Sequence, residues 1–150
     1  MVIRAFTFSL YTGKILNKIK QIMSYYFSKT LDTSFEEAIE KTTEALKEEG
    51  FGILTEIDIK ATLKKKLDVD FKKYQILGAC NPPLAHKALS AEDHIGLMLP
   101  CNVIVQQHEN GNVEVAAVDP VASMQAIEND ELGGVAKEVR DLLKKVIESL

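Results

Sequence analysis

Two cysteines, each followed by an asparagine and close to a proline, are the residues of this sequence best suited to chemistry. Cys80 lies in the segment ACNPP and Cys101 in the segment LPCN, and each segment falls at the expected edge of a strand. We expect both thiols to be buried structural side chains, since free cysteine is among the most buried residue types. The alternatives are a redox pair, a disulfide or a reactive thiol at Cys80, where the start of the next helix can lower the thiol pKa.

A metal site and a charged site are two further alternatives around these thiols. A metal could use both cysteines with His86 and His94, but their spacings match no paired-ligand motif, so we expect no metal. Glu56, Asp58 and Lys60 alternate along an expected strand and would share one face, where paired carboxylates can do acid–base work. A solvated sheet face is the interpretation we favour, because Lys60 would neutralise part of the charge.

No complete catalytic motif accompanies these residues. The sequence contains no glycine-rich phosphate loop and no G-x-S-x-G, H-E-x-x-H or C-x-x-C motif. Tyr74 could reach into a pocket, although an interior tyrosine with one hydrogen bond is the commoner case. We therefore treat the polar residues as candidate lining of a ligand pocket, with no catalytic residue assigned.

Local patterns predict the elements that would hold these residues. Strand-like runs cover Ser24–Leu31, Phe51–Ile59 and Tyr74–Cys80, and a hairpin surrounds Asn110–Gly111. Capping boxes formed by Thr33 with Glu36 or by Ser34 with Glu37 predict a helix start, and Gly50 predicts its end. Other helices are predicted over residues 59–67, after the N-cap Asn81 with Pro82, and at the C-terminus, where Val135, Val139, Leu142, Leu143, Val146 and Ile147 share a face.

The hairpin allows two registers, and the apolar pattern selects between them. A two-residue Asn-Gly turn would mix polar and apolar side chains on each face. A three-residue loop with a left-handed Gly111 pairs Val105 with Val115 and Gln106 with Glu114, which separates the faces. We predict the three-residue loop. The resulting order β-α-β-α-β-α-β-β-α favours an α+β fold, an antiparallel sheet with helices on one face.

Composition and charge limit the classes of protein. The chain has 150 residues, 46% of them hydrophobic and 27% charged, which fits one globular domain. Two cysteines are too few for a disulfide-stapled secreted domain, so we expect a reducing, cytoplasmic location. The net charge of −4 makes nucleic acid an unexpected partner. No apolar run approaches the roughly 20 residues that span a bilayer.

Residues 1–22 differ from the rest of the chain. They carry four bases and no acid, so residues 23–150 hold all 22 acids and 14 of the 18 bases, a net charge of −8. The apolar stretch here is short and lacks a cleavage motif, which argues against a signal peptide. We expect a basic appendage outside a single domain of residues 23–150, with Met23 a possible natural start. Membrane contact by a basic amphipathic helix in this segment is the alternative.

The segments ILGACNPPLAHKAL (76–89) and IGLMLPCNVIV (95–105) resemble the domain-of-unknown-function family numbered 302. The resemblance extends from about residue 24 to the C-terminal helix. It matches at Glu56, Lys60, Tyr74, Gly78, Cys80, Asn81, Pro82, Pro100, Cys101 and Asn102. It implies a TATA-binding-protein-like two-layer sandwich with a curved antiparallel sheet. It implies no catalytic residues, and DNA binding does not follow from the fold.

Two hypotheses for function follow. The first is a non-enzymatic accessory protein that binds a small apolar ligand and acts as a homodimer. We expect the ligand to contact a set of polar residues around the cysteine segments: Glu56, Lys60, Tyr74, Cys80, Asn81, Cys101 and Asn102. The second is a small cofactor-free enzyme or redox protein that uses Cys80 or Cys101, with Glu56 or His86 as a base. We prefer the first, because the second lacks a nucleophile–base motif.

Overall fold

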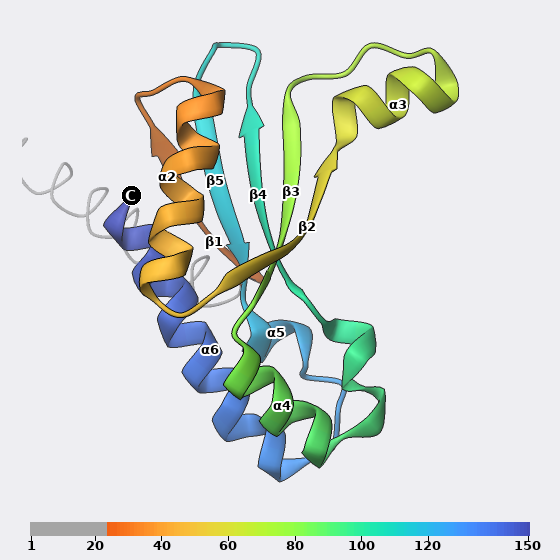
Figure 1. Cartoon of the computed structure of the whole chain (residues 1–150), viewed down its shortest axis with the longest axis vertical. Helices are drawn as coiled ribbons and strands as arrows, with labels where there is room; N and C mark the ends of the chain where they lie inside the picture. The colour runs from red at the N-terminus through yellow and green to blue at the C-terminus, as the bar shows by residue number, and fades with distance from the viewer. Residues whose placement is uncertain (1–23) are drawn as a thin grey trace, which may run out of the picture.

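Five antiparallel strands form one sheet in the order β1-β5-β4-β3-β2 (Figure 1). The structure is a computed structural model, and it describes residues 24–150. The strands are β1 (Tyr26–Leu31), β2 (Gly52–Asp58), β3 (Tyr74–Cys80), β4 (Cys101–Gln107) and β5 (Val113–Val118). The helices are α2 (Phe35–Glu48), α3 (Ile59–Leu67), α4 (Pro82–Ala91), the 3-10 helix η1 (Asp93–Met98), α5 (Pro120–Ser123) and α6 (Asp130–Ser149).

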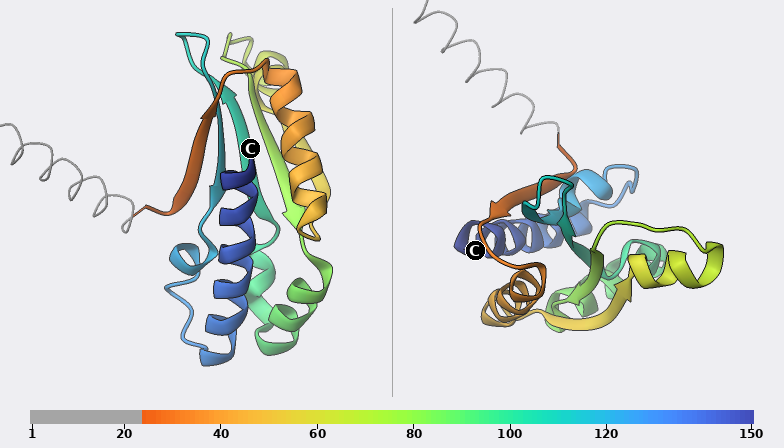
Figure 2. Two further views of the ribbon diagram at one scale, coloured as in Figure 1. Left: turned by 90° about the vertical axis from the view of Figure 1, so that its left-hand side faces the viewer. Right: turned by 90° about the horizontal axis from the view of Figure 1, so that it is seen from above.

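Helices α2 and α6 pack against one face of the sheet (Figures 1 and 2). Alternate strand residues point to this face and form the core with the apolar stripes of the two helices. The sheet contributes Leu77, Ala79, Val103, Val105, Val113, Val115 and Ala117, and the helices contribute Ala38, Leu46, Leu143 and Val146. The predicted α+β class and the one-sided helical layer are therefore confirmed. The opposite face, which we call the open face, lies away from α2 and α6.

Helix α2 begins and ends as its sequence predicts. Ser34 is the N-cap and its hydroxyl oxygen accepts a hydrogen bond of 3.1 Å from the Glu37 amide. The Glu37 carboxylate accepts a short hydrogen bond from Thr33 Oγ1. Gly50 has a φ of +82°, the left-handed conformation that glycine adopts after a helix at little cost. Of the two capping boxes, the one that starts at Ser34 supplies the cap.

The β4–β5 hairpin has the predicted three-residue loop. Val105 pairs with Val115 and Gln106 with Glu114, and Gly111 has a φ of +86°. The His108 amide donates to the Asn112 carbonyl at 2.8 Å and closes the loop. This register places valines toward the helices and the Gln106–Glu114 pair on the open face.

The expected alternation along β2 is wrong, because the strand contains an irregularity at Leu54. Ile53 pairs with Ala79 on the helix side, whereas Thr55 pairs with Gly78 on the open face, so one extra residue separates the two pairs. Of the expected set on one strand face, Glu56 and Asp58 do share a face, and the expectation is wrong for Lys60. The strand ends at Asp58, which caps α3, and Lys60 lies within that helix.

Gly78 lets β2 and the start of β4 approach β3 closely. A Cβ atom at this position would lie 2.2 Å from Thr55 Oγ1 and 2.8 Å from Pro100 Cγ, well inside van der Waals contact. Only glycine fits the site without a shift of its neighbours.

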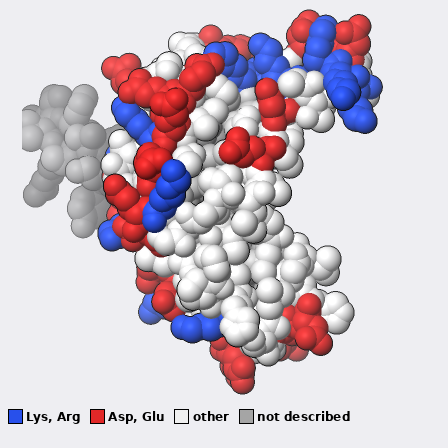
Figure 3. Space-filling model, viewed as in Figure 1, with Lys and Arg blue, Asp and Glu red and all other residues white. Residues whose placement is uncertain are grey.

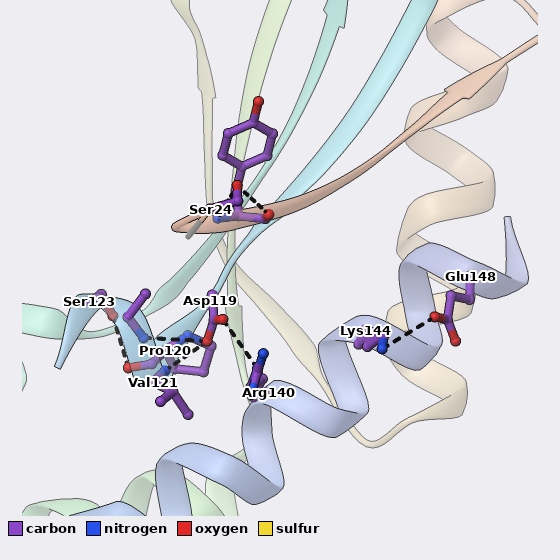
Figure 4. A network of polar contacts seen from close by, with 10 residues as sticks. Ser24, Asp119, Pro120, Val121, Ser123, Arg140, Lys144 and Glu148 are labelled. Atoms are coloured by element: carbon purple, nitrogen blue, oxygen red, sulfur yellow. Dashed lines mark hydrogen bonds and ion pairs between the residues drawn. The ribbon is translucent and has the colours of Figure 1, made fainter. Parts of the chain in front are cut away.

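A buried carboxylate ties the end of β5 to helix α6 (Figure 4). Asp119 is 4% exposed, and its Oδ1 accepts hydrogen bonds from the amides of Val121 and Ala122. Its Oδ2 lies 3.1 Å from Arg140 Nε. The Arg140 guanidinium in turn lies 5.8 Å from the ring centroid of Phe27. These contacts join β1, β5, α5 and α6 at the end of the sheet where β5 finishes.

The interpretations placed on residues 1–22 lie outside the described residues. Within residues 24–150, none of the helices combines the length and the apolar character needed to cross a membrane.

Candidate functional site

The open face presents ordered rows of side chains that run across the strands. In one row, Tyr74 pairs with Gln106, which pairs with Glu114. In the next row, Ile104 lies between Ile76 and Ala116. Residues paired across antiparallel strands point to the same face, so a polar row lies directly beside an apolar row.

A groove of about 420 Å³ follows these rows and is the candidate ligand site. Its volume falls within the range of about 300–1,000 Å³ that is typical of small-molecule sites. We call it the open-face groove. Strands β1, β3, β4 and β5 all contribute to its lining, which comprises Tyr25, Tyr26, Tyr74, Asn102, Ile104, Gln106, Glu114, Ala116, Ala117 and Val118.

A chain of hydrogen bonds organises the polar end of the groove. Lys72 Nζ donates to Gln106 Oε1 at 2.7 Å, and Gln106 Nε2 donates to Glu114 Oε2 at 3.0 Å. The same Glu114 oxygen lies 2.8 Å from Nε2 of His108. These partners fix the amide and the carboxylate in position, which is what a site needs to orient a ligand.

Three tyrosines form the aromatic part of the groove. Tyr25 and Tyr26 meet edge to face, with ring centroids 5.1 Å apart. The pKa of Tyr74 is raised, chiefly by burial and to a smaller extent by the nearby Tyr25 hydroxyl and the Glu114 carboxylate. The Tyr74 hydroxyl therefore stays protonated around neutral pH and can both donate and accept a hydrogen bond.

The two thiols line a different and much smaller cavity. Cys80, Asn81 and Cys101 surround it together with apolar side chains of α4 and α6, and its volume is about 30 Å³. This is room for about one water molecule. Asn81 Oδ1 accepts from the Leu84 amide at 3.3 Å, so it acts as the cap of α4.

Both cysteines are free thiols in an environment that disfavours the thiolate. Burial raises the pKa of Cys80. Burial, with a contribution from the neighbouring Cys80, raises the pKa of Cys101 to about 11. The expectation that the α4 N-terminus lowers the pKa of Cys80 is thus wrong, because desolvation raises that pKa. Protonated thiols are poor nucleophiles, so this arrangement does not favour redox or nucleophilic chemistry.

The sequence-predicted ligand residues lie in three separate places. Tyr74 and Asn102 line the open-face groove, while the cysteines and Asn81 line the small cavity. Glu56 and Lys60 are exposed at the β2 edge and on α3. Within residues 24–150, no group of three histidine, cysteine, aspartate or glutamate side chains is arranged to hold a metal ion.

Sequence reasoning missed most of the groove. Tyr25, Tyr26 and Glu114 were not among the predicted ligand residues. The predicted hairpin register did place Gln106 opposite Glu114, but only the packing of β1 and β3 beside this pair turns it into part of a groove.

Comparisons with known proteins agree with the fold. The family model described as "Domain of unknown function DUF302" matches residues 27–150. A solved structure titled as an uncharacterized conserved protein DUF302 from Bacillus stearothermophilus is 29% identical, with a TM-score of 0.77. The match covers 83% of this chain and 96% of that one. No curated protein matches the chain.

Proposed function

The chain belongs to the family of the domain of unknown function DUF302, and from its geometry we propose that it is a non-enzymatic protein that binds a small, largely apolar ligand and acts as a homodimer. The open-face groove carries this proposal. It joins an apolar floor to three aromatic rings and a few fixed polar groups, the composition usual for ligand sites. The alternative of a cysteine-dependent redox protein has less support, because burial raises both thiol pKa values. Free thiols fit the expected cytoplasmic location.

A screen of small aromatic compounds by protein NMR tests the ligand site. Binders are expected to shift the resonances of Tyr74, Ile104 and Glu114. An Ala116→Leu substitution should weaken these binders, because it adds a side chain to the floor of the groove. Ala61→Leu, which adds the same side chain on the exposed surface of α3, is the matched control. Binding that Ala116→Leu leaves unchanged would show that the groove is not the site.

The distribution of charge supports the homodimer. Lys, Arg, Asp and Glu side chains gather over α2 and α3, whereas the middle of the surface in the same view, between the upper end of β2 and the bottom of the molecule, is largely uncharged (Figure 3). Large apolar side chains are exposed in this region: Leu54 is 65% exposed and Leu97 83% exposed. A second copy is the partner we favour, because two copies can bring this uncharged surface together without opposing their excess acids.

Light scattering after size exclusion tests the dimer. The full chain should have twice the monomer mass, and Leu97→Asp should convert it to a monomer. Leu67→Asp, on an exposed and already charged helix, should leave the dimer intact. A monomer at all concentrations tested, or equal effects of the two substitutions, would contradict the dimer proposal.

A further inference from the structure

The lining of the open-face groove has a one-sided charge. It contains the carboxylate of Glu114, and the described residues contribute no lysine or arginine to it. Three tyrosine rings add to this character, since the face of an aromatic ring carries a negative electrostatic potential. The charged and aromatic groups of the lining therefore favour a cation over an anion.

We propose that the ligand of this groove is a small organic ammonium compound, an amine carried on an apolar or aromatic body. This inference rests on the proposed ligand-binding function and names the chemical class of its ligand. The apolar body would lie on Ile104 and Ala116, and the ammonium group would lie among the tyrosines and Glu114. Aromatic side chains combined with a carboxylate are a recognised way to bind such groups.

The hydrogen bonds of Glu114 leave it able to accept from a ligand. The contacts with Gln106 and His108 both fall on Oε2. Oε1 takes no hydrogen bond from any residue in the described part of the chain. The Glu114 side chain is 18% exposed, so a charge-assisted hydrogen bond to it would form in a partly desolvated setting, where such bonds are strong.

The protein already holds an ammonium group at this end of the groove. Nζ of Lys72 lies 5.9 Å from the ring centroid of Tyr74 while it donates to Gln106. The negative potential also acts on Tyr74. Burial is the largest cause of the raised pKa of Tyr74, and Tyr25 and the Glu114 charge add to it. Lys72 is not among the residues that line the groove. Its position indicates that this end of the groove favours an ammonium group, and it does not fill the groove.

Titration of the full-length chain with three probes of similar shape tests the inference. Phenethylammonium, phenethyl alcohol and hydrocinnamate share a phenyl ring and differ in charge. Isothermal titration calorimetry at neutral pH should show the ammonium binding about tenfold more tightly than the alcohol, and the carboxylate binding more weakly than either.

Two isosteric variants locate the effect. Glu114→Gln should bring the affinity for the ammonium down to that for the alcohol, and leave the alcohol unchanged. Glu109→Gln removes the same charge from the exposed hairpin loop outside the groove and should change neither affinity. Tyr25→Leu should weaken ammonium binding without a loss of stability, because Tyr25 is 70% exposed.

The outcomes separate this inference from the proposed function. Equal binding of ammonium and alcohol, or tightest binding of the carboxylate, would overturn the ammonium class while a ligand groove remains. Equal losses in Glu114→Gln and Glu109→Gln would overturn it as well, since they would reflect overall charge. No binding of any of the three probes would overturn both the ligand class and the groove as a binding site.

Discussion

Replacement of Gly78 by alanine is a direct test of how β2, β3 and β4 are held together. The new Cβ would lie 2.2 Å from Thr55 Oγ1 and 2.8 Å from Pro100 Cγ, where ordinary contacts begin near 3.4 Å. Thr55 lies in the edge strand β2 and Pro100 directly precedes β4, so the new Cβ must displace the side chain of the first and the ring of the second. Overpacking of this kind costs about 1–3 kcal/mol. The lower chain entropy of alanine returns about 0.5–1 kcal/mol. We expect a net loss of about 1 kcal/mol, within a range of about 0–2.5 kcal/mol.

Urea unfolding of matched variants measures this cost. Gly52→Ala is the control, since a Cβ there meets no atom within 4 Å, and it should be neutral or slightly stabilising. Thr55→Ala in the Gly78→Ala background should recover part of the loss, because it removes the 2.2 Å contact but leaves Pro100 in place. The double-mutant cycle should show a coupling of about 1 kcal/mol. Equal stability of Gly78→Ala and Gly52→Ala would refute the packing argument.

Four further predictions concern Asp119, the two cysteines and the start of helix α2. Asp119→Ala should lower the free energy of unfolding by about 2–3 kcal/mol, because it removes the cap of α5 and the partner of the half-exposed Arg140. Urea unfolding measures this loss. A loss smaller than that caused by the replacement of an exposed acidic residue with alanine would contradict the prediction. Cys80 and Cys101 should react slowly with Ellman's reagent in the native protein at pH 8 and fast in urea; rapid native reaction would revive the redox hypothesis. Burial raises the pKa of Cys101 from 9.0 to about 11, so between these pH values the folded chain keeps a proton that the unfolded chain releases. The stability from this thiol is therefore present below pH 9 and is lost as the pH rises through 11. The free energy of unfolding of Cys101→Ala should decline less over this pH range than that of the unchanged protein. Ser34→Ala should cost about 1 kcal/mol in thermal unfolding, and no change would remove Ser34 as the working cap.

The elements of the fold were predictable where a local rule decides the backbone. Ser34 and Gly50 mark the ends of α2 through capping and a left-handed residue, which depend on neighbours within four positions. The hairpin register was predictable for a similar reason. A one-residue slip would have turned Val105 and Val115 away from the helices, so the apolar pattern allowed a single solution.

The bulge in β2 was not predictable, because its cause is distant in the sequence. The alternation around Leu54 looks regular when it is read along the strand. The close approach at Gly78, however, places Thr55 on the open face while Ile53 remains on the helix side. A glycine in a strand interior indicates such a close approach in general, but it does not name the neighbour.

The candidate site was misplaced for a related reason. The cysteine segments drew attention because their residue types are reactive, yet desolvation by α4 and α6 keeps Cys101 protonated in a cavity with room for about one water. The groove is built from common residues that become informative only in register. Tyr26, Tyr74 and Glu114 come from three strands that are distant along the chain, and they share one groove only because β1, β3 and β5 all present the same face around β4. A ligand site of this kind depends on the order of strands. In related sheets, candidate sites should therefore be sought among side chains that are paired across neighbouring strands on the open face, and not among reactive residues along the sequence.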